Sequence, residues 1–144
     1  MTLLMMVLST IGQPVDEFSA GAAPSHPIVE WISEAGWIGV VQIFVMAAVI
    51  APIVEEIMFR GVLYRHLRDA TGRRRLVISV LFSGGISSFV FAAIHPQGIF
   101  GIPVLMSLAI GFCLAREWRG SLIAPMTMHA INNGLVTSML VFTM

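Results

Sequence analysis

The chain has 144 residues, of which 57% are hydrophobic and 11% are charged. With a mean hydropathy of +0.89, this composition is typical of a membrane protein. Its basic residues are eight arginines, balanced by eight acidic residues, so no basic surface indicates a nucleic-acid partner. Cys113 is the single cysteine, which excludes a disulfide framework and a CxxC metal site.

Segments without charge predict the fold. Residues 1–12 are apolar but too short to span comfortably, and we interpret them as a short N-terminal hydrophobic helix. Residues 13–36 contain three prolines and four acidic residues and predict an external loop. A helix that crosses a hydrocarbon core of about 30 Å needs roughly 20 residues. Four charge-free stretches come close to or exceed that length: residues 37–54, 76–94, 98–115 and 120–144.

These stretches predict an all-α, polytopic transmembrane helix bundle with four full spanning helices plus the short N-terminal helix. Nothing in the sequence marks a repeat or a second domain, so we expect a single membrane-embedded domain over residues 1–144. Membrane lipid is its predicted surrounding.

The arginines predict the topology. They fall in two loops that lie on the same side if every stretch spans, and the positive-inside rule places both loops in the cytoplasm of a multi-pass protein of the inner (plasma) membrane. The acidic loop then lies outside and the N-terminus inside. The arginines concerned are Arg65, Arg68, Arg73, Arg74, Arg75, Arg116 and Arg119.

The stretch APIVEEIMFRG at residues 51–61 places charge directly after an apolar segment. Glu56 and Arg60 are four residues apart, so on a helix they share a face and can pair. Glu55 is rotated away by about 100° and is left free. Pro52, just before them, suits a helix start or a kink because it cannot donate a backbone N–H.

Two further polar pairs lie in apolar segments. His95 follows Phe91 by four residues, and His129 precedes Asn133 by four. Polar groups are costly in lipid, so we expect these side chains to converge with the Glu–Arg stretch or to face water. Each pair could also be explained without a site, because histidine and asparagine often join helices through hydrogen bonds.

Depth restricts how this cluster can form. A helix that ended at Arg60 would leave Glu55 near the inner surface, too far from His95 for contact. A helix that continues to Asp69, with an Arg65–Asp69 pair and termination at Gly72, raises Glu55 to roughly 20 Å. We therefore predict one long, tilted helix through the EExxxR stretch.

At this point the sequence resembles a known family. EEIMFRG, FAAIH and HAINN are similar to the EExxxR, FxxxH and HxxxN motifs of the CPBP intramembrane proteases, which include the CAAX prenyl endopeptidases and bacteriocin-processing relatives. Each motif alone is a weak signal, but the three occur in order on separate apolar segments. The resemblance covers about residues 40–133 and implies an intramembrane endopeptidase that acts on a peptide or a lipidated protein.

Peptide hydrolysis requires an activated water and a stabilised oxyanion. We assign Glu55 and His95 to the water and His129 and Asn133 to the oxyanion, with Glu56 and Arg60 as a supporting ion pair. The resemblance implies the same assignment.

Other interpretations stay open. Glu55, His95 and His129 could instead bind zinc, because a glutamate with two histidines is a known catalytic ligand set, although HExxH is absent. A catalytically inactive family member acting as a membrane scaffold or immunity protein is one alternative function. A proton-linked carrier is another, although such carriers usually show two symmetric halves.

Overall fold

A computed structural model describes residues 27–72 and 76–143 of the chain. The predicted N-terminal helix at residues 1–12 and most of the loop after it lie outside these residues. The described part is helical and contains no strand, in agreement with the all-α prediction. Its elements are α2 (Pro27–Glu34), α3 (Trp37–Val45), η2 (Met46–Ile50), α4 (Ala51–Glu56), η3 (Ile57–Leu63), α5 (Tyr64–Ala70), α6 (Leu76–Ala93), α7 (Gly98–Arg119) and α8 (Ile123–Thr143).

The five elements from α3 to α5 form one helix, Trp37–Ala70, of 34 residues. The predicted continuation past Arg60 is confirmed, and Arg65 pairs with Asp69 across one turn at 3.9 Å. The helix ends where Gly72 takes a φ of +68°, a left-handed conformation that glycine adopts without steric cost.

Two π-helical turns, η2 and η3, flank α4, which carries both glutamates. Pro52 explains the first of them, since a proline inside a helix removes one backbone donor and displaces the preceding turn. Ala51 donates its backbone N–H to the carbonyl of Met46, five residues back, rather than to that of Ala47. Pro52 has no N–H to offer, so the carbonyl of Ala47 lacks its usual partner within the helix.

Among the described residues, three helices are long and apolar enough to cross a membrane: Trp37–Ala70, Leu76–Ala93 and Gly98–Arg119. The helix α8 has 21 residues, but its polar residues keep it outside that set. A fourth full span therefore remains a prediction.

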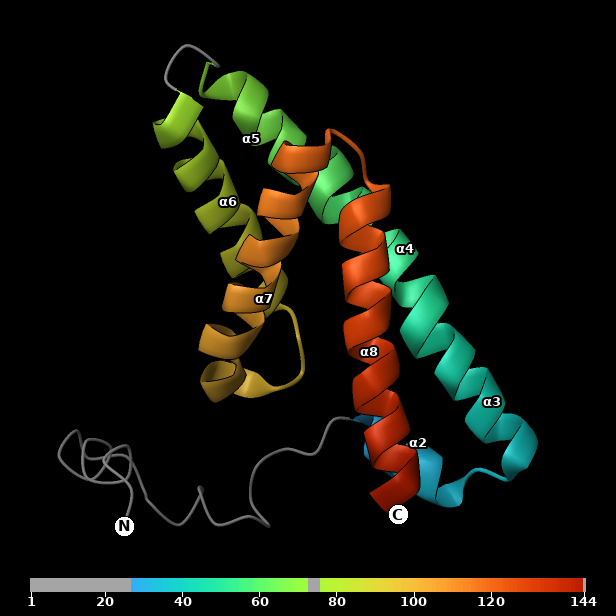
Figure 1. Cartoon of the computed structure of the whole chain (residues 1–144). Helices are drawn as coiled ribbons and strands as arrows, with labels where there is room; N and C mark the ends of the chain where they lie inside the picture. Colours follow the sequence, from blue (N-terminus) through green and yellow to red (C-terminus); the bar gives the residue numbers. More distant parts are fainter. Residues whose placement is uncertain (1–26, 73–75, 144) are drawn as a thin grey trace, which may run out of the picture.

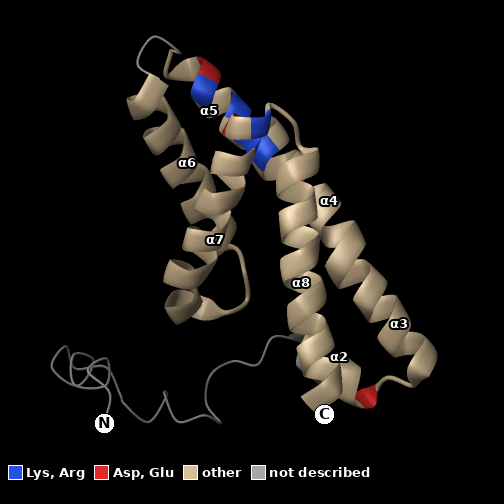
Figure 2. Cartoon of the chain, viewed as in Figure 1, with Lys and Arg blue, Asp and Glu red and all other residues tan. Residues whose placement is uncertain are grey.

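Figure 1 shows α6 and α7 as an antiparallel pair beside the α5 end of the long helix, while α8 runs along its α3 and α4 portions. The basic residues that the structure describes gather at one end of this bundle, on α5 and near the α7–α8 corner, whereas the acidic residue at the end of α2 lies at the other end (Figure 2). Arg65, Arg68, Arg116 and Arg119 thus lie at the same end, as the predicted topology requires. Which side of the membrane this end faces remains a prediction.

Large apolar side chains point outward along every long helix, for example Phe142 at 89% exposure. The interior instead holds small and polar groups. Among them, Ser79, Ser83, Ser87 and Ser88 of α6 are fully buried, and Ser87 donates a hydrogen bond to the carbonyl of Phe59 at 3.3 Å. Small residues let helix backbones approach closely, and their hydroxyls join helices where lipid supplies no hydrophobic drive for association.

Candidate active site

The glutamates of the EExxxR stretch have different surroundings. Glu56 is completely buried, whereas the side chain of Glu55 keeps 28% of its exposure. Successive residues on a helix are rotated by about 100°, so one carboxylate points into the bundle interior and the other toward a more accessible face. The two can therefore serve different purposes.

Glu56 and Arg60 form a fully buried ion pair, with Nη1 of Arg60 donating to Oε1 of Glu56 at 2.9 Å. The same Oε1 accepts a second hydrogen bond from Nδ1 of His129 on α8, also at 2.9 Å. Nη2 of Arg60 donates to the carbonyl of Ala109 on α7 at 3.0 Å. The pair therefore connects the long helix to both α7 and α8.

Aromatic rings enclose the guanidinium of Arg60. Its central carbon lies 4.8 Å from the ring centre of Phe91 and 5.1 Å from that of Phe112. A cation over the face of an aromatic ring is stabilised by the negative charge of that face. Phe112 also stacks on His129, with ring centres 4.9 Å apart. These rings let a charged group occupy an apolar interior and limit how His129 can rotate.

His95 and His129 are each held through the Nδ1 atom of the ring. Nδ1 of His95 contacts the carbonyl of Phe91 at 2.6 Å, and Nδ1 of His129 contacts Glu56. Because a carbonyl and a carboxylate only accept hydrogen bonds, each Nδ1 must carry the proton. Each Nε2 is then left with a lone pair when the ring is neutral.

Both Nε2 atoms face Glu55. Its Oε2 lies 3.8 Å from Nε2 of His95 and 3.7 Å from Nε2 of His129, longer than a hydrogen bond. This Oε2 is buried and has no hydrogen-bond partner. Three electron-pair donors thus converge with no proton between them, which is an arrangement that fits a water molecule or a cation.

The long helix and α6 bring these groups to one depth. At 1.5 Å per residue, Glu55 lies about 22 Å from Ala70, and Ala93 lies about 26 Å from Leu76. His95 follows α6 in the connection to α7, so a modest difference in tilt brings it level with Glu55.

The donor types Glu, His and His suit zinc. Among the described residues, however, no three His, Cys, Asp or Glu side chains are placed as a preformed metal site. The contacts that His95 and His129 make through Nδ1 match the second contact that is usual for a metal-bound histidine, which donates to a carboxylate or a carbonyl.

Asn133 is not brought into this cluster. Its Nδ2 donates to the carbonyl of Ala47 at 3.0 Å, the carbonyl that Pro52 leaves without a helical partner. In the structure Asn133 thus fastens α8 to the turn preceding α4. Its expected role at the oxyanion remains a prediction.

A second polar cluster was not predicted from the sequence. Glu117 on α7 accepts hydrogen bonds at 2.8 Å from the hydroxyl of Tyr64 and from Nε of Arg68, and Arg68 also contacts Ser79. Two features of the sequence could have indicated it. Tyr64 and Arg68 are four residues apart and so share a helix face, and Glu117 is an acidic residue between two arginines, Arg116 and Arg119. This cluster joins α5, α6 and α7 at the arginine-rich end.

Comparisons with known proteins indicate the family of the chain. Residues 37–135 match the family model described as type II CAAX prenyl endopeptidase Rce1-like. The membrane-embedded CAAX protease MroQ of Staphylococcus aureus (strain USA300) is 33% identical over 97 residues, which cover 67% of this chain. The same alignment covers 38% of that relative, so the chain corresponds to well under half of its length. No solved structure matches the chain.

The matched range contains all three motifs and every residue of the Glu55–His95–His129 cluster. On this evidence, the chain belongs to the Rce1-like CAAX endopeptidase group of the CPBP family.

Proposed function

We propose that the protein is an intramembrane endopeptidase that hydrolyses a peptide bond of a membrane-associated peptide or lipidated protein. The main support is the unpartnered, buried Oε2 of Glu55 facing the Nε2 atoms of His95 and His129 at 3.8 and 3.7 Å. Membership of a CAAX endopeptidase family and the apolar helices support the reaction class and the membrane setting.

In the proposed reaction, a water molecule occupies the space between these three atoms. It donates one hydrogen bond to Oε2 of Glu55 and the other to Nε2 of His95. As the water oxygen attacks the carbonyl carbon of the substrate, Glu55 takes its proton and later transfers it to the leaving amine.

His129 is suited to stabilise the oxyanion when its ring carries a second proton, on Nε2, taken up from solvent before the substrate binds. Its Nδ1–H bond to Glu56 holds the ring in place, and the carboxylate stabilises the imidazolium charge. Nε2–H can then donate to the oxyanion. Arg60 neutralises Glu56 when His129 is neutral, so the buried carboxylate is never left without a partner.

We further propose that Asn133 acts by positioning. Its bond to the carbonyl of Ala47 holds the turn that leads into α4, and α4 carries Glu55. An asparagine so engaged stabilises the geometry of the site without touching the substrate.

The proposal includes a zinc ion that Glu55, His95 and His129 would bind, since their donor types fit zinc. When bound, such an ion lowers the pKa of a coordinated water to about 7. Because it would occupy the same Oε2 and Nε2 atoms, a zinc ion would replace the side-chain proton transfers assigned above, and the two schemes are alternatives.

Glu55→Gln tests the mechanism. The change is nearly isosteric and removes the proton acceptor, so cleavage of a fluorogenic peptide by purified protein should fall by at least about 10²-fold. The melting temperature should change little. Glu34→Gln, at an exposed glutamate of α2, is the matched control and should keep full activity. The substrate panel should pair prenylated with unprenylated peptides.

Cleavage at the wild-type rate by the Glu55→Gln protein would reject Glu55 as the general base. Absence of cleavage by the wild-type protein across the whole peptide panel would favour the catalytically inactive scaffold. Equal cleavage of prenylated and unprenylated peptides would leave the mechanism standing but remove lipidated proteins as the required substrate.

A further inference from the structure

A pocket at the arginine-rich end of the bundle is separate from the Glu55 cluster. It has a volume of about 530 Å³ and is lined mainly by charged side chains. Those lining residues are Arg60, Arg65, Arg68, Arg116 and Glu117. Four cations therefore share one cavity with a single carboxylate, an arrangement that attracts an anion.

Two of these arginines have carboxylate partners at close range. Arg68 is paired with Glu117, and Arg60 is paired with Glu56, which lies outside the pocket wall. The positive charge that remains in the pocket belongs to Arg65 and Arg116.

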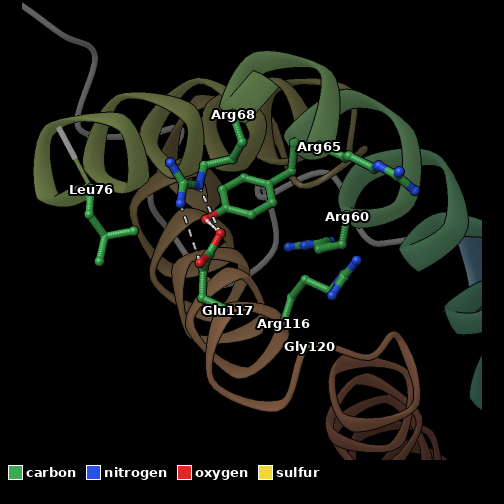
Figure 3. Close-up of a pocket in the computed structure, with 8 residues that line it drawn as sticks. Arg60, Arg65, Arg68, Leu76, Arg116, Glu117 and Gly120 are labelled. Carbon is green, nitrogen blue, oxygen red and sulfur yellow. Dashed lines mark hydrogen bonds and ion pairs between the residues drawn. The ribbon is translucent and has the colours of Figure 1, made fainter. Parts of the chain in front are cut away.

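Arg65 and Arg116 differ in what holds them. Arg65 reaches Asp69 only at 3.9 Å, and both side chains are more than half exposed, so this pair is weak. Figure 3 shows Arg65 extending away from the others, whereas Arg60 and Arg116 lie across the pocket from the Arg68–Glu117 pair.

Within the described part of the chain, Arg116 forms no ion pair or hydrogen bond. Its Nε is nevertheless buried, as is the Nε of Arg60, and neither atom has a hydrogen-bond partner. Both side chains line the cavity, and two Nε–H groups without acceptors beside it favour an anionic acceptor there.

The level of the pocket in the membrane identifies the source of that anion. On the same α7–α8 corner, Trp118 is 82% exposed, and the guanidinium of Arg119 lies 5.3 Å from its ring centre. Exposed tryptophan with arginine is typical of the bilayer–water interface. Leu76, which also lines the pocket, is 59% exposed and offers an apolar rim. Guanidinium groups bind phosphate through paired hydrogen bonds.

We propose that this pocket binds the phosphate of an anionic phospholipid headgroup, with Arg116 as the principal contact and Arg60 and Arg68 as the surrounding cations. Basic pockets between membrane helices at the interface commonly hold such headgroups. Because Arg60 also pairs with Glu56, the bound phosphate lies one side chain away from the carboxylate that holds His129.

The test measures lipid binding and not cleavage, so it is independent of the peptidase proposal. The full chain, purified in detergent, is titrated with short-chain phosphatidylglycerol, short-chain phosphatidylcholine or inorganic phosphate, and binding is followed by microscale thermophoresis. We expect saturable binding of phosphatidylglycerol that weakens with added salt, and weaker binding of the other two ligands.

Arg116→Gln should lower the affinity for phosphatidylglycerol at least about fivefold. Arg119→Gln is the matched control: it removes the same charge one helical turn away, at an exposed residue that does not line the pocket, and should change affinity less than twofold. Equal losses in both variants would overturn the proposal, because they would indicate general attraction to positive charge.

The wild-type titrations decide the matter even if Arg116→Gln protein does not fold. Phosphatidylcholine that binds as tightly as phosphatidylglycerol would overturn the proposed anion site. Inorganic phosphate that binds as tightly as phosphatidylglycerol would assign the pocket to a free anion and overturn the lipid.

Discussion

Removing Arg60 while leaving Glu56 in place isolates the energetic role of the buried ion pair. In Arg60→Leu protein, the Oε1 of Glu56 keeps its bond to His129, but the carboxylate loses its cation in a completely buried position. The carbonyl of Ala109 also loses the donor that ties α7 to the long helix. Both changes destabilise the folded state.

The magnitude follows from the burial of the pair. Removing one partner of a buried ion pair costs about 3–5 kcal/mol, because the remaining charge is neither solvated nor paired. Folded proteins are typically stable by about 5–15 kcal/mol, so this single change should remove a large share of the total. Arg65→Leu is the control, since Arg65 forms an exposed pair with Asp69 that is worth at most about 1 kcal/mol.

Replacing both partners should recover much of the loss. In the double variant Glu56→Gln with Arg60→Met, no charge is left buried, and the amide oxygen of glutamine can still accept from Nδ1 of His129. Methionine suits the space between Phe91 and Phe112, where a flexible, polarisable side chain packs well against rings. Exchange of a buried pair for matched neutral groups is often neutral or stabilising.

Thermal unfolding in detergent and the yield of monodisperse protein would measure these effects. The expected order of stability places Arg65→Leu near wild type, the double variant next, and Arg60→Leu lowest. A double variant less stable than Arg60→Leu would refute the pairing argument. So would an Arg65→Leu variant that is destabilised as strongly as Arg60→Leu.

Three further outcomes are expected. Asn133→Ala should lower the free energy of unfolding by about 1–3 kcal/mol, because the carbonyl of Ala47 loses its hydrogen-bond donor. The loss should be smaller in a Pro52→Ala background, which restores a backbone N–H. Equal losses in both backgrounds would argue against a positioning role for Asn133. In a Cys113→Ala background, a membrane-impermeant thiol reagent applied to intact cells should label Glu34→Cys and spare Arg119→Cys; the reverse would invert the topology. The side-chain mechanism predicts that peptide cleavage persists in a zinc chelator, whereas loss of cleavage that added zinc restores would assign Glu55, His95 and His129 to the metal.

The spacing of residues along the chain determined the ion pairs within the long helix and the approximate bounds of the helices. The Glu56–Arg60 and Arg65–Asp69 pairs follow from a four-residue separation, because side chains at that spacing share a helix face. The long helix through EExxxR also followed from sequence, since only its continuation to Asp69 could raise Glu55 to the level of His95. The charge-free stretches predicted α6 and α7 to within a few residues at each end.

Contacts between helices were decided only by the tertiary structure. Spacing along one helix does not specify how that helix is rotated and tilted against another, so no pattern in the chain indicated that His129 would share an oxygen of Glu56 with Arg60. The Arg68–Glu117 pair depends on the same rotation, across 49 residues of sequence. Asn133 contacts Ala47 and not the histidines because the π-turn before Pro52 leaves a carbonyl to be satisfied, and the packing of α8 against the long helix brings Asn133 to that carbonyl.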